Sequence, residues 1–286
     1  MMCVGAALAG AIEQLGAAGV PEPRPDAEVL LAHALGTSRA GVIARGREPL
    51  LQEVAARFER LVARRAARVP LHHLVGEREF WSLPFAVDAR VLIPRPETEL
   101  LVETALAVAP AARRVLDLGT GSGAVAAALA RALPAARVWG SDRERDALAV
   151  ARANLARHAP GVGCVAADLI APWRAGAFDL IVSNPPYVSD AELATLAPEV
   201  RDHEPRAALD GGPDGLSCIR RLVADAPRAL AAGGWLVMEI GAGQAAAVSE
   251  LVAVDGRWVG ARPVRDHAGI ERVVAVERRR DEWTRS

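Results

Sequence analysis

The sequence contains no lysine: all 34 of its basic residues are arginine. A chain without lysine cannot form a Schiff base through a lysine amine, and it cannot build a Walker-type phosphate loop. The formal net charge is only −1, so no overall positive field would attract nucleic acid. Two classes of lysine-dependent enzyme are therefore excluded, and a general nucleic-acid binder is disfavoured.

Cysteine is scarce as well. The chain has three cysteines, Cys3, Cys164 and Cys218. They show neither metal-ligand nor redox spacing, and we expect buried thiols in a reducing compartment. His72, His73 and His203 lack partners at metal-ligand spacing, so no metal site is expected. The sequence has no basic leader segment and no apolar run of about 18 residues, which predicts a cytoplasmic protein without membrane contact.

The first seventy residues predict helices. Apolar residues recur at helical spacing in three stretches, residues 4–15, 27–35 and 51–69. The pattern then changes, and residues 79–81 and 84–87 read as short strands joined by a turn. We therefore expect a small helical domain over residues 1–73 and a β-hairpin linker over residues 74–93.

Strands and helices alternate from residue 94 onwards. Strands are expected at residues 114–118, 137–141, 163–167, 178–183, 235–240, 258–263 and 271–277. Helices are expected at residues 123–133, 144–157, 215–231 and 243–254. Alternation with short connections predicts a parallel, doubly wound sheet. No helix separates the last two strands, so the predicted fold is α/β, with a seven-stranded sheet whose last strand is antiparallel, over residues 94–286.

A glycine-rich loop lies where the first of these strands meets a helix. Residues 117–123 read Asp-Leu-Gly-Thr-Gly-Ser-Gly, and such glycines allow a tight turn and a close approach of backbone to a ligand. Asp142 ends the next strand, where a carboxylate can accept hydrogen bonds from ribose hydroxyls. Asp168 ends the third strand, where an adenine edge would lie. The pattern favours a nucleoside cofactor, although aspartates that only cap strand–helix junctions would look the same.

A dinucleotide is the alternative cofactor. The dinucleotide-binding pattern has its third glycine at the position occupied here by Ala124. Some dehydrogenases tolerate that difference, so the loop alone does not decide between the two cofactors. The next motif favours the first of them.

The only tyrosine of the chain ends the run Asn184-Pro185-Pro186-Tyr187, at the tip of the fourth predicted strand. An enzyme that methylates an amide or aromatic amine must hold the NH2 group so that its lone pair faces the methyl donor. The Asn184 side-chain carbonyl and the Pro185 backbone carbonyl can accept the two N–H groups. Pro186 stiffens the turn, and Tyr187 offers a flat face for stacking.

Catalysis by such a motif would consist mostly of positioning and preorganised dipoles. The glycine loop and this motif together predict an amino-methyltransferase that uses S-adenosylmethionine. A turn that is merely stiffened by its prolines is the alternative interpretation of the motif.

With these motifs in place, nearly the whole sequence resembles the glutamine N5-methyltransferases of peptide-chain release factors, the PrmC/HemK family. The segments that carry the resemblance are residues 78–83, 92–99, 117–123, 183–187 and 203–216. The Asn-Pro-Pro-Tyr run is shared with DNA adenine and rRNA guanine methyltransferases. The segment Ile-Pro-Arg-Pro-Glu-Thr-Glu at residues 93–99 is much more specific to this family.

The resemblance implies a class I S-adenosylmethionine-dependent methyltransferase. Its implied substrate is the glutamine of the Gly-Gly-Gln motif in class 1 release factors, which the helical domain would help to recognise. The expected cofactor-binding residues are Gly119, Thr120, Gly121, Ser122, Gly123, Asp142, Asp168, Leu169 and Asn184. The expected substrate-binding residues are Asn184, Pro185, Pro186 and Tyr187, of which Asn184, Pro185 and Tyr187 are the expected catalytic residues.

Some positions differ from the family pattern or have an open role. Some relatives carry an aromatic residue where this chain has Leu169, and Trp173 is a candidate substitute. Arg95, Glu97 and Thr98 either shape the methionine end of the cofactor site or cap a helix and form a salt bridge.

Two other functions stay open. A nucleic-acid amino-methyltransferase acting on rRNA guanine N2 or DNA adenine N6 would use the same pocket. However, residues 1–70 carry nine arginines against seven acidic residues, which is a weak phosphate-binding surface. A non-enzymatic adaptor is disfavoured because the cofactor and catalytic positions are intact. We therefore expect a monomer whose partner is a class 1 release factor, without direct binding of nucleic acid.

Overall fold

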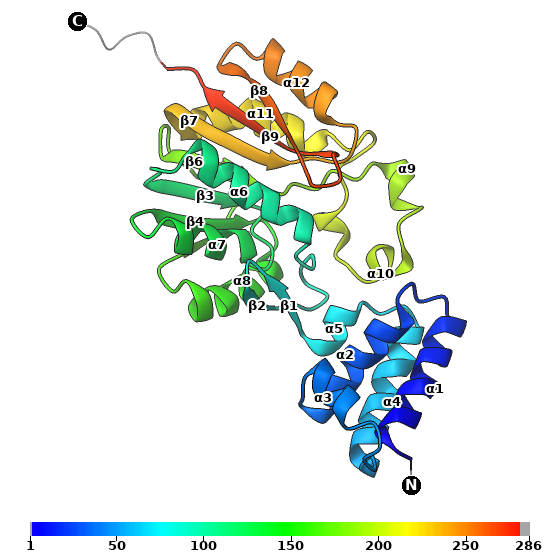
Figure 1. The fold of residues 1–286 in the computed structure, drawn as a ribbon. Helices are drawn as coiled ribbons and strands as arrows, with labels where there is room; N and C mark the ends of the chain where they lie inside the picture. Colours follow the sequence, from blue (N-terminus) through cyan, green and yellow to red (C-terminus); the bar gives the residue numbers. More distant parts are fainter. Residues whose placement is uncertain (1, 281–286) are drawn as a thin grey trace, which may run out of the picture. The chain divides into compact units, whose positions relative to one another are not determined.

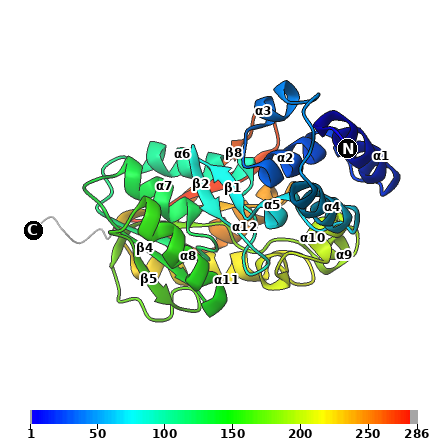
Figure 2. The ribbon, with the colours of Figure 1, turned by 90° about the horizontal axis from the view of Figure 1, so that it is seen from below.

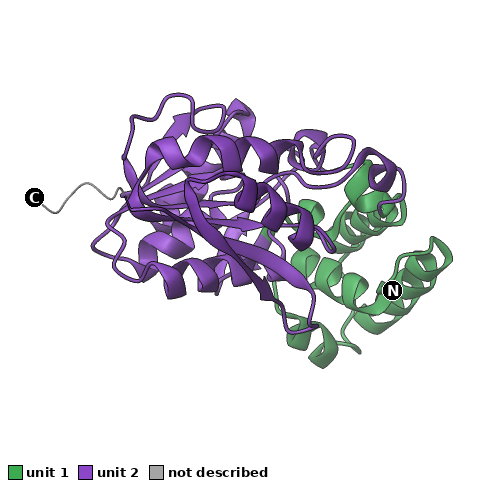
Figure 3. Cartoon of the chain, turned by 90° about the horizontal axis from the view of Figure 1, so that it is seen from above, with its two compact units in different colours: residues 1–77, 197–203 green, residues 78–196, 204–286 purple. Residues whose placement is uncertain are grey.

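The structure, a computed structural model, describes residues 2–280. The chain forms two compact units (Figure 3): the helical unit contains residues up to 77 together with residues 197–203, and the sheet unit contains residues 78–196 and those from 204 onwards. The segment 197–203 thus joins the helical unit although it lies late in the sequence. The division into domains at residues 1–73, 74–93 and 94–286 stays a prediction.

The helical unit is built on an amphipathic pattern. Its helices are α1 (Val4–Ala17), α2 (Pro23–Leu35), α3 (Arg39–Ala44), α4 (Gln52–Ala66) and α5 (Leu71–Val75) (Figure 1). Leu15, Leu30 and Leu31 are fully buried in its core, and Phe58 is almost so. Gly36 ends α2 in the left-handed region at φ 64°, where a residue without Cβ is favoured.

A cluster of charges holds segment 197–203 in the helical unit. Arg65 is buried; its Nε donates to Asp26 Oδ2 at 2.7 Å and its Nη1 to Glu199 Oε1 at 2.9 Å. Arg68 donates through Nε and Nη2 to the two carboxylate oxygens of Glu199, each at 2.7 Å. Although burial raises the pKa of Glu199, these arginine hydrogen bonds lower it to about 2. Glu199 lies in the short helix α10 (Pro198–Arg201).

The hairpin between the helices and the large sheet has a two-residue turn. Strands β1 (Glu77–Phe80) and β2 (Leu83–Ala86) flank Trp81 and Ser82, whose φ angles are 52° and 57°. Positive φ at both central residues is the signature of a type I′ turn, the turn that matches the twist of the strands. Glu99 supports it, because its Oε1 accepts a hydrogen bond from Trp81 N at 2.8 Å.

The large sheet confirms the predicted α/β topology. Its strands are β3 (Arg114–Leu118), β4 (Arg137–Asp142), β5 (Gly163–Ala166), β6 (Phe178–Ser183), β7 (Leu230–Glu239), β8 (Trp258–Arg265) and β9 (Glu271–Arg278). The order is β5-β4-β3-β6-β7-β9-β8. Pairing is parallel from β5 to β7, and β9 is antiparallel to both of its neighbours. The seven strands and the antiparallel end are as predicted.

Helices cover both faces of this sheet. The further elements of the sheet unit are η1 (Pro96–Thr98), α6 (Glu99–Val108), α7 (Ala124–Ala132), α8 (Arg145–His158), α9 (Asp190–Leu193), η2 (Arg206–Ala208), α11 (Ser217–Ala229) and α12 (Ala245–Val254). One core cluster joins α6, α7 and α8 to the sheet, and a second joins α11 and α12 to its other face. Figure 2 shows α6 and α7 on one side of the strands and α11 on the other.

Alternate residues of each central strand enter opposite cores. Val115 and Val182 belong to the first core cluster, and Leu116 and Ile181 belong to the second. Strands buried on both faces need apolar side chains at nearly every position, which is why they were visible in the sequence.

Two further observations concern the expectations about compartment. All three cysteines are half-buried, not buried as expected. No helix within residues 2–280 is long and apolar enough to cross a membrane.

Candidate functional site

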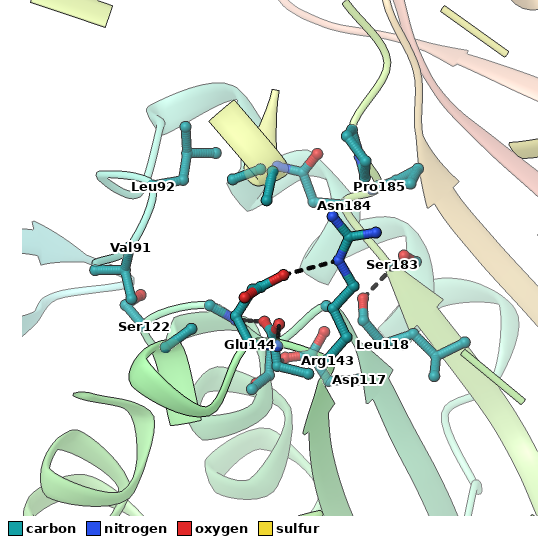
Figure 4. A pocket seen from close by; sticks show the side chains of 18 of the residues that line it. Val91, Leu92, Asp117, Leu118, Ser122, Arg143, Glu144, Ser183, Asn184 and Pro185 are labelled. Atoms are coloured by element: carbon teal, nitrogen blue, oxygen red, sulfur yellow. Dashed lines mark hydrogen bonds and ion pairs between the residues drawn. The ribbon is translucent and has the colours of Figure 1, made fainter. Parts of the chain in front are cut away.

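A cavity of about 280 Å³ lies at the carboxyl edge of the parallel strands. Strand β3 pairs with β4 on one side and with β6 on the other, so Leu118 is level with both Ser141 and Ser183. The connections leave β3 and β6 in opposite directions across the sheet, and such a switch point opens a crevice between the strand ends. Figure 4 shows Ser122 and Asp117 on one side of this cavity and Asn184 and Pro185 on another.

The glycine loop borders the cavity in a conformation that requires glycine. Gly119, Gly121 and Gly123 have φ angles of 71°, 53° and 82°, in the left-handed region that L side chains rarely occupy. Gly119 and Gly121 line the cavity with Thr120 and Ser122, whereas Gly123 lies outside the lining. Gly123 instead precedes the first residue of α7.

Asp117 fixes the conformation of this loop by accepting two hydrogen bonds, a role that the sequence did not reveal. Its Oδ2 accepts hydrogen bonds from Thr120 Oγ1 at 2.7 Å and from Ala126 N at 3.1 Å. The residue is only 2 % exposed. Burial raises the pKa of Asp117 to about 7, although these two hydrogen bonds act in the opposite direction. Asp117 thus joins strand, loop and helix.

Asp142 lines the cavity and also braces the loop. Its Oδ2 accepts a hydrogen bond from Gly121 N at 3.0 Å, and its Oδ1 accepts one from Glu144 N at 2.9 Å. Burial raises the pKa of Asp142. A carboxylate has about four lone-pair sites, so both oxygens keep acceptor capacity for a hydroxyl in the cavity.

The third strand end differs in part from expectation. Asp168 lines the cavity but pairs with Arg221 of α11, whose Nη2 lies 2.7 Å from Asp168 Oδ2. Leu169 also lines the cavity and has φ 49°, a strained conformation for a leucine. Trp173 packs edge-on against Phe178 with ring centroids 5.0 Å apart and does not appear among the described residues of the lining. Leu169, rather than Trp173, therefore forms this wall.

The Asn-Pro-Pro-Tyr run follows β6 directly. Asn184, Pro185 and Pro186 line the cavity, and Asn184 Nδ2 donates to Thr98 Oγ1 at 3.2 Å. Tyr187 lies outside the lining and is partly buried in the second core cluster. Its hydroxyl donates to Glu239 Oε1 at 3.0 Å. The base of the run is fixed because Ser183 Oγ donates to Leu118 O at 2.9 Å.

The segment before α6 supplies another wall. Arg95 and Thr98 line the cavity, whereas Glu97 does not. Arg95 Nη2 lies 2.7 Å from Glu204 Oε2, and the Glu204 side chain is only 1 % exposed. Burial raises the pKa of Glu204, and Arg95 acts against that shift. The structure therefore shows a salt bridge and a cavity wall in one segment.

Several lining residues had no signal in the sequence. Examples are Val91, Arg143, Cys218 and Arg221. They come from loops and helices whose approach to the cavity is set by the fold. No group of three or more His, Cys, Asp or Glu side chains within residues 2–280 is arranged to hold a metal ion.

Comparison with known proteins places this geometry in context. Residues 6–76 match the family model of the PrmC N-terminal domain, and residues 96–201 match that of the methyltransferase small domain. The chain is 47 % identical over 256 residues to the release factor glutamine methyltransferase of Geobacter sulfurreducens, covering 90 % of each chain. It is 42 % identical over 279 residues to the enzyme of that name from Moorella thermoacetica, covering 96 % of this chain and 98 % of the relative.

A solved methyltransferase from Pyrococcus furiosus matches with a TM-score of 0.54 at 18 % identity, over 77 % of this chain and 100 % of that one. At that identity the likeness concerns the fold alone.

Proposed function

The chain belongs to the release factor glutamine methyltransferase family, and from that premise we propose that it methylates the side-chain amide nitrogen of the glutamine in the Gly-Gly-Gln motif of class 1 release factors. The methyl donor is S-adenosylmethionine. The observation that carries the proposal is the Asn184 amide. Its Nδ2 is engaged by Thr98, which leaves Oδ1 to accept an N–H group of a substrate amide.

The residues at the cavity fit this cofactor. The left-handed glycines at 119 and 121 let the backbone approach a ligand where a Cβ would strain the loop. Asp142 has lone pairs left for ribose hydroxyls, and Leu169 offers an apolar surface beside the strand end where Asp168 can accept from an adenine amino group. When bound, S-adenosylmethionine supplies a methyl group on a positively charged sulfur, which needs no further activation.

The substrate nitrogen is what the protein must prepare. An amide nitrogen delocalises its lone pair into the neighbouring carbonyl, so it is a poor nucleophile. Asn184 Oδ1 and the Pro185 carbonyl each accept one N–H group, which orients the nitrogen and stabilises the positive charge that develops there as the new bond forms. No base is needed before transfer, because the extra proton can leave the nitrogen afterwards.

Tyr187 supports the Asn-Pro-Pro-Tyr run from behind the cavity lining and does not act as a base. Burial and the neighbouring Glu239 raise the pKa of Tyr187, so its hydroxyl stays protonated near neutral pH. Its ring packs against the second core cluster and holds the end of the motif in place.

The helical unit contributes to recognition of the release factor. It matches the family's N-terminal domain, and its charges are balanced, which suits a protein surface better than a nucleic-acid backbone. A monomer and a cytoplasmic location stay predictions.

The test is methyl transfer from labelled S-adenosylmethionine to a purified class 1 release factor. The proposal predicts label on the protein with Gly-Gly-Gln and none on a Gly-Gly-Ala variant. Label on rRNA or DNA, with neither release factor labelled, would contradict the proposed substrate but leave the assigned fold and cofactor unaffected. Activity on the protein should also be insensitive to salt, unlike binding to a phosphate backbone.

A further inference from the structure

A buried carboxyl group lies behind the Asn-Pro-Pro-Tyr run. Glu239 ends β7, and the residue before it, Met238, is level with Ser183 of the neighbouring strand β6. Asn184 and Glu239 are therefore the next residues along two parallel strands at the same sheet edge. Glu239 is only 2 % exposed, and it has no place in the transfer chemistry described above.

One hydroxyl group donates to this carboxyl, and a second, that of Thr98, lowers its pKa. Tyr187 Oη donates to Glu239 Oε1 at 3.0 Å. Burial raises the pKa of Glu239, and interactions with the Thr98 and Tyr187 hydroxyls oppose that shift, as hydrogen-bond donors would. Glu239 Oε2 is buried and makes no hydrogen bond to a described residue, so it keeps the capacity to accept the Thr98 proton.

The carboxyl decides which way the Thr98 hydroxyl points. A hydroxyl has one proton, and the Glu239 carboxyl can only accept it when that carboxyl is ionised. Once Thr98 donates towards Glu239, its oxygen can only accept from Asn184, and Asn184 must present Nδ2 at the observed 3.2 Å. The two ends of an amide are told apart only by such a network, and this network leaves Oδ1 for the substrate.

Without the carboxyl, nothing fixes the direction of the hydrogen bond between Thr98 and Asn184. Thr98 would be free to donate to Asn184 Oδ1, and the amide would then present its NH2 group to the cavity. An NH2 group facing the NH2 group of a substrate amide places donor against donor. Such a complex binds the cofactor normally but holds the substrate nitrogen wrongly.

We propose that Glu239 is a positioning residue for methyl transfer, which acts through Thr98 to fix the Asn184 amide with Oδ1 facing the substrate and through Tyr187 to fix the far end of the motif. This inference rests on the proposed function. Neither Glu239 nor Thr98 needs to touch the substrate.

The test compares turnover in three variants and one matched control. Thr98→Val keeps the shape of the side chain and removes the hydroxyl, and Thr98→Ser restores it. Glu239→Met keeps the length of the side chain and removes both acceptors. The control is Thr104→Val, since Thr104 is a buried threonine on α6 whose hydroxyl has no hydrogen-bond partner among the described residues.

We expect Thr98→Val and Glu239→Met each to lower kcat by about tenfold or more, with the Kd for S-adenosylmethionine within about threefold of the unmodified protein. Thr98→Ser should restore at least about a third of the turnover. Because both changes act through one chain of hydrogen bonds, Glu239→Met should lower kcat by a clearly smaller factor in the Thr98→Val background than in the unmodified protein. Equal losses in the two backgrounds, or kcat unchanged in Thr98→Val, would overturn the inference.

A second measurement does not depend on turnover. The side-chain amide signals of Asn184 in the 15N NMR spectrum can be identified by their absence in Asn184→Ala. They should shift in Thr98→Val and in Glu239→Met but not in Thr104→Val. If the unmodified protein fails to methylate Gly-Gly-Gln, the proposed function fails. If the Asn184 signals stay unchanged in both variants, the relay through Thr98 fails.

Discussion

Asp117 gives the sharpest test of how the glycine loop is held. Its Oδ2 accepts both hydrogen bonds, from Thr120 Oγ1 and Ala126 N. Asp117→Asn can place an amide oxygen at the same point and keep both bonds, but it cannot ionise. The variant therefore separates the hydrogen bonds from the burial of charge.

The magnitude follows from the pKa. Burial raises the pKa of Asp117 from 3.8 to about 7, so the folded protein holds a proton that the unfolded chain releases above about pH 4. The favourable contribution of Asp117 to the free energy of unfolding is complete below pH 3.8 and is lost as the pH rises through 7. At 1.36 kcal/mol for each pKa unit, the unmodified protein should lose about 3 kcal/mol of unfolding free energy from this group between about pH 5 and pH 8.

The assay is urea unfolding of both proteins at these two pH values. Other titrating groups affect both proteins alike, so the difference between them isolates Asp117. We expect Asp117→Asn to gain about 3 kcal/mol relative to the unmodified protein as the pH rises from about 5 to 8. A difference that changes by less than about 1 kcal/mol would show that the Asp117 carboxyl is not buried as described.

Two further predictions concern other residues. Asn184→Ala should lower kcat by about 10²-fold with little change in cofactor affinity, whereas Asp142→Ala should first weaken cofactor binding. Calorimetry measures the cofactor Kd and steady-state kinetics measures kcat. Equal losses in both quantities for both variants would contradict the assigned roles. Glu199→Gln should lower the unfolding free energy by about 1–3 kcal/mol at neutral pH, because it weakens the hydrogen bonds from Arg65 and Arg68. Since the pKa of Glu199 is lowered to about 2, the difference in unfolding free energy between the two proteins should shrink as the pH falls from about 4.5 towards 2. Urea unfolding followed by circular dichroism at both ends of that range measures this difference. A difference that stays constant would contradict the ion pairs.

The centre of the sheet could be predicted because its central strands are buried on both faces. Largely apolar runs such as residues 178–183 carry that signal directly. Strand β7 was less clear: it begins at Leu230, five residues before the predicted start. The helix predicted over residues 215–231 covered the first two residues of β7, and the pairing of Phe178 with Leu230 shows that the strand begins there.

The short helices after the Asn-Pro-Pro-Tyr run were not predicted. Helices α9 and α10 have four residues each, too few for a hydrophobic period to be recognised. Helix α10 is held by Glu199, whose partners lie 131 and 134 positions away in the sequence. A contact over that distance is set by the fold and leaves no local pattern.

Some residues of the candidate site could likewise be predicted from the sequence, and others could not. Motifs at strand ends were visible because glycine, proline and asparagine have restricted or special backbone and hydrogen-bonding properties. Glu239 was not, since a single glutamate within an apolar strand gives no local sign of its environment, and only the structure shows that it is buried and bonded to Tyr187. The ion pair between Asp168 and Arg221 was hidden for a related reason, because α11 approaches the cavity from outside the motif.

The most direct test of the central claim is to locate the methyl group by fragmentation mass spectrometry. A class 1 release factor is incubated with S-adenosylmethionine and either the unmodified protein or Asn184→Ala, and the peptide that contains Gly-Gly-Gln is sequenced. We predict one added methyl group on the glutamine with the unmodified protein and a strongly reduced amount with the variant. A methyl group on any other residue, or equal methylation by both proteins, would contradict the claim that Asn184 holds a glutamine amide for transfer.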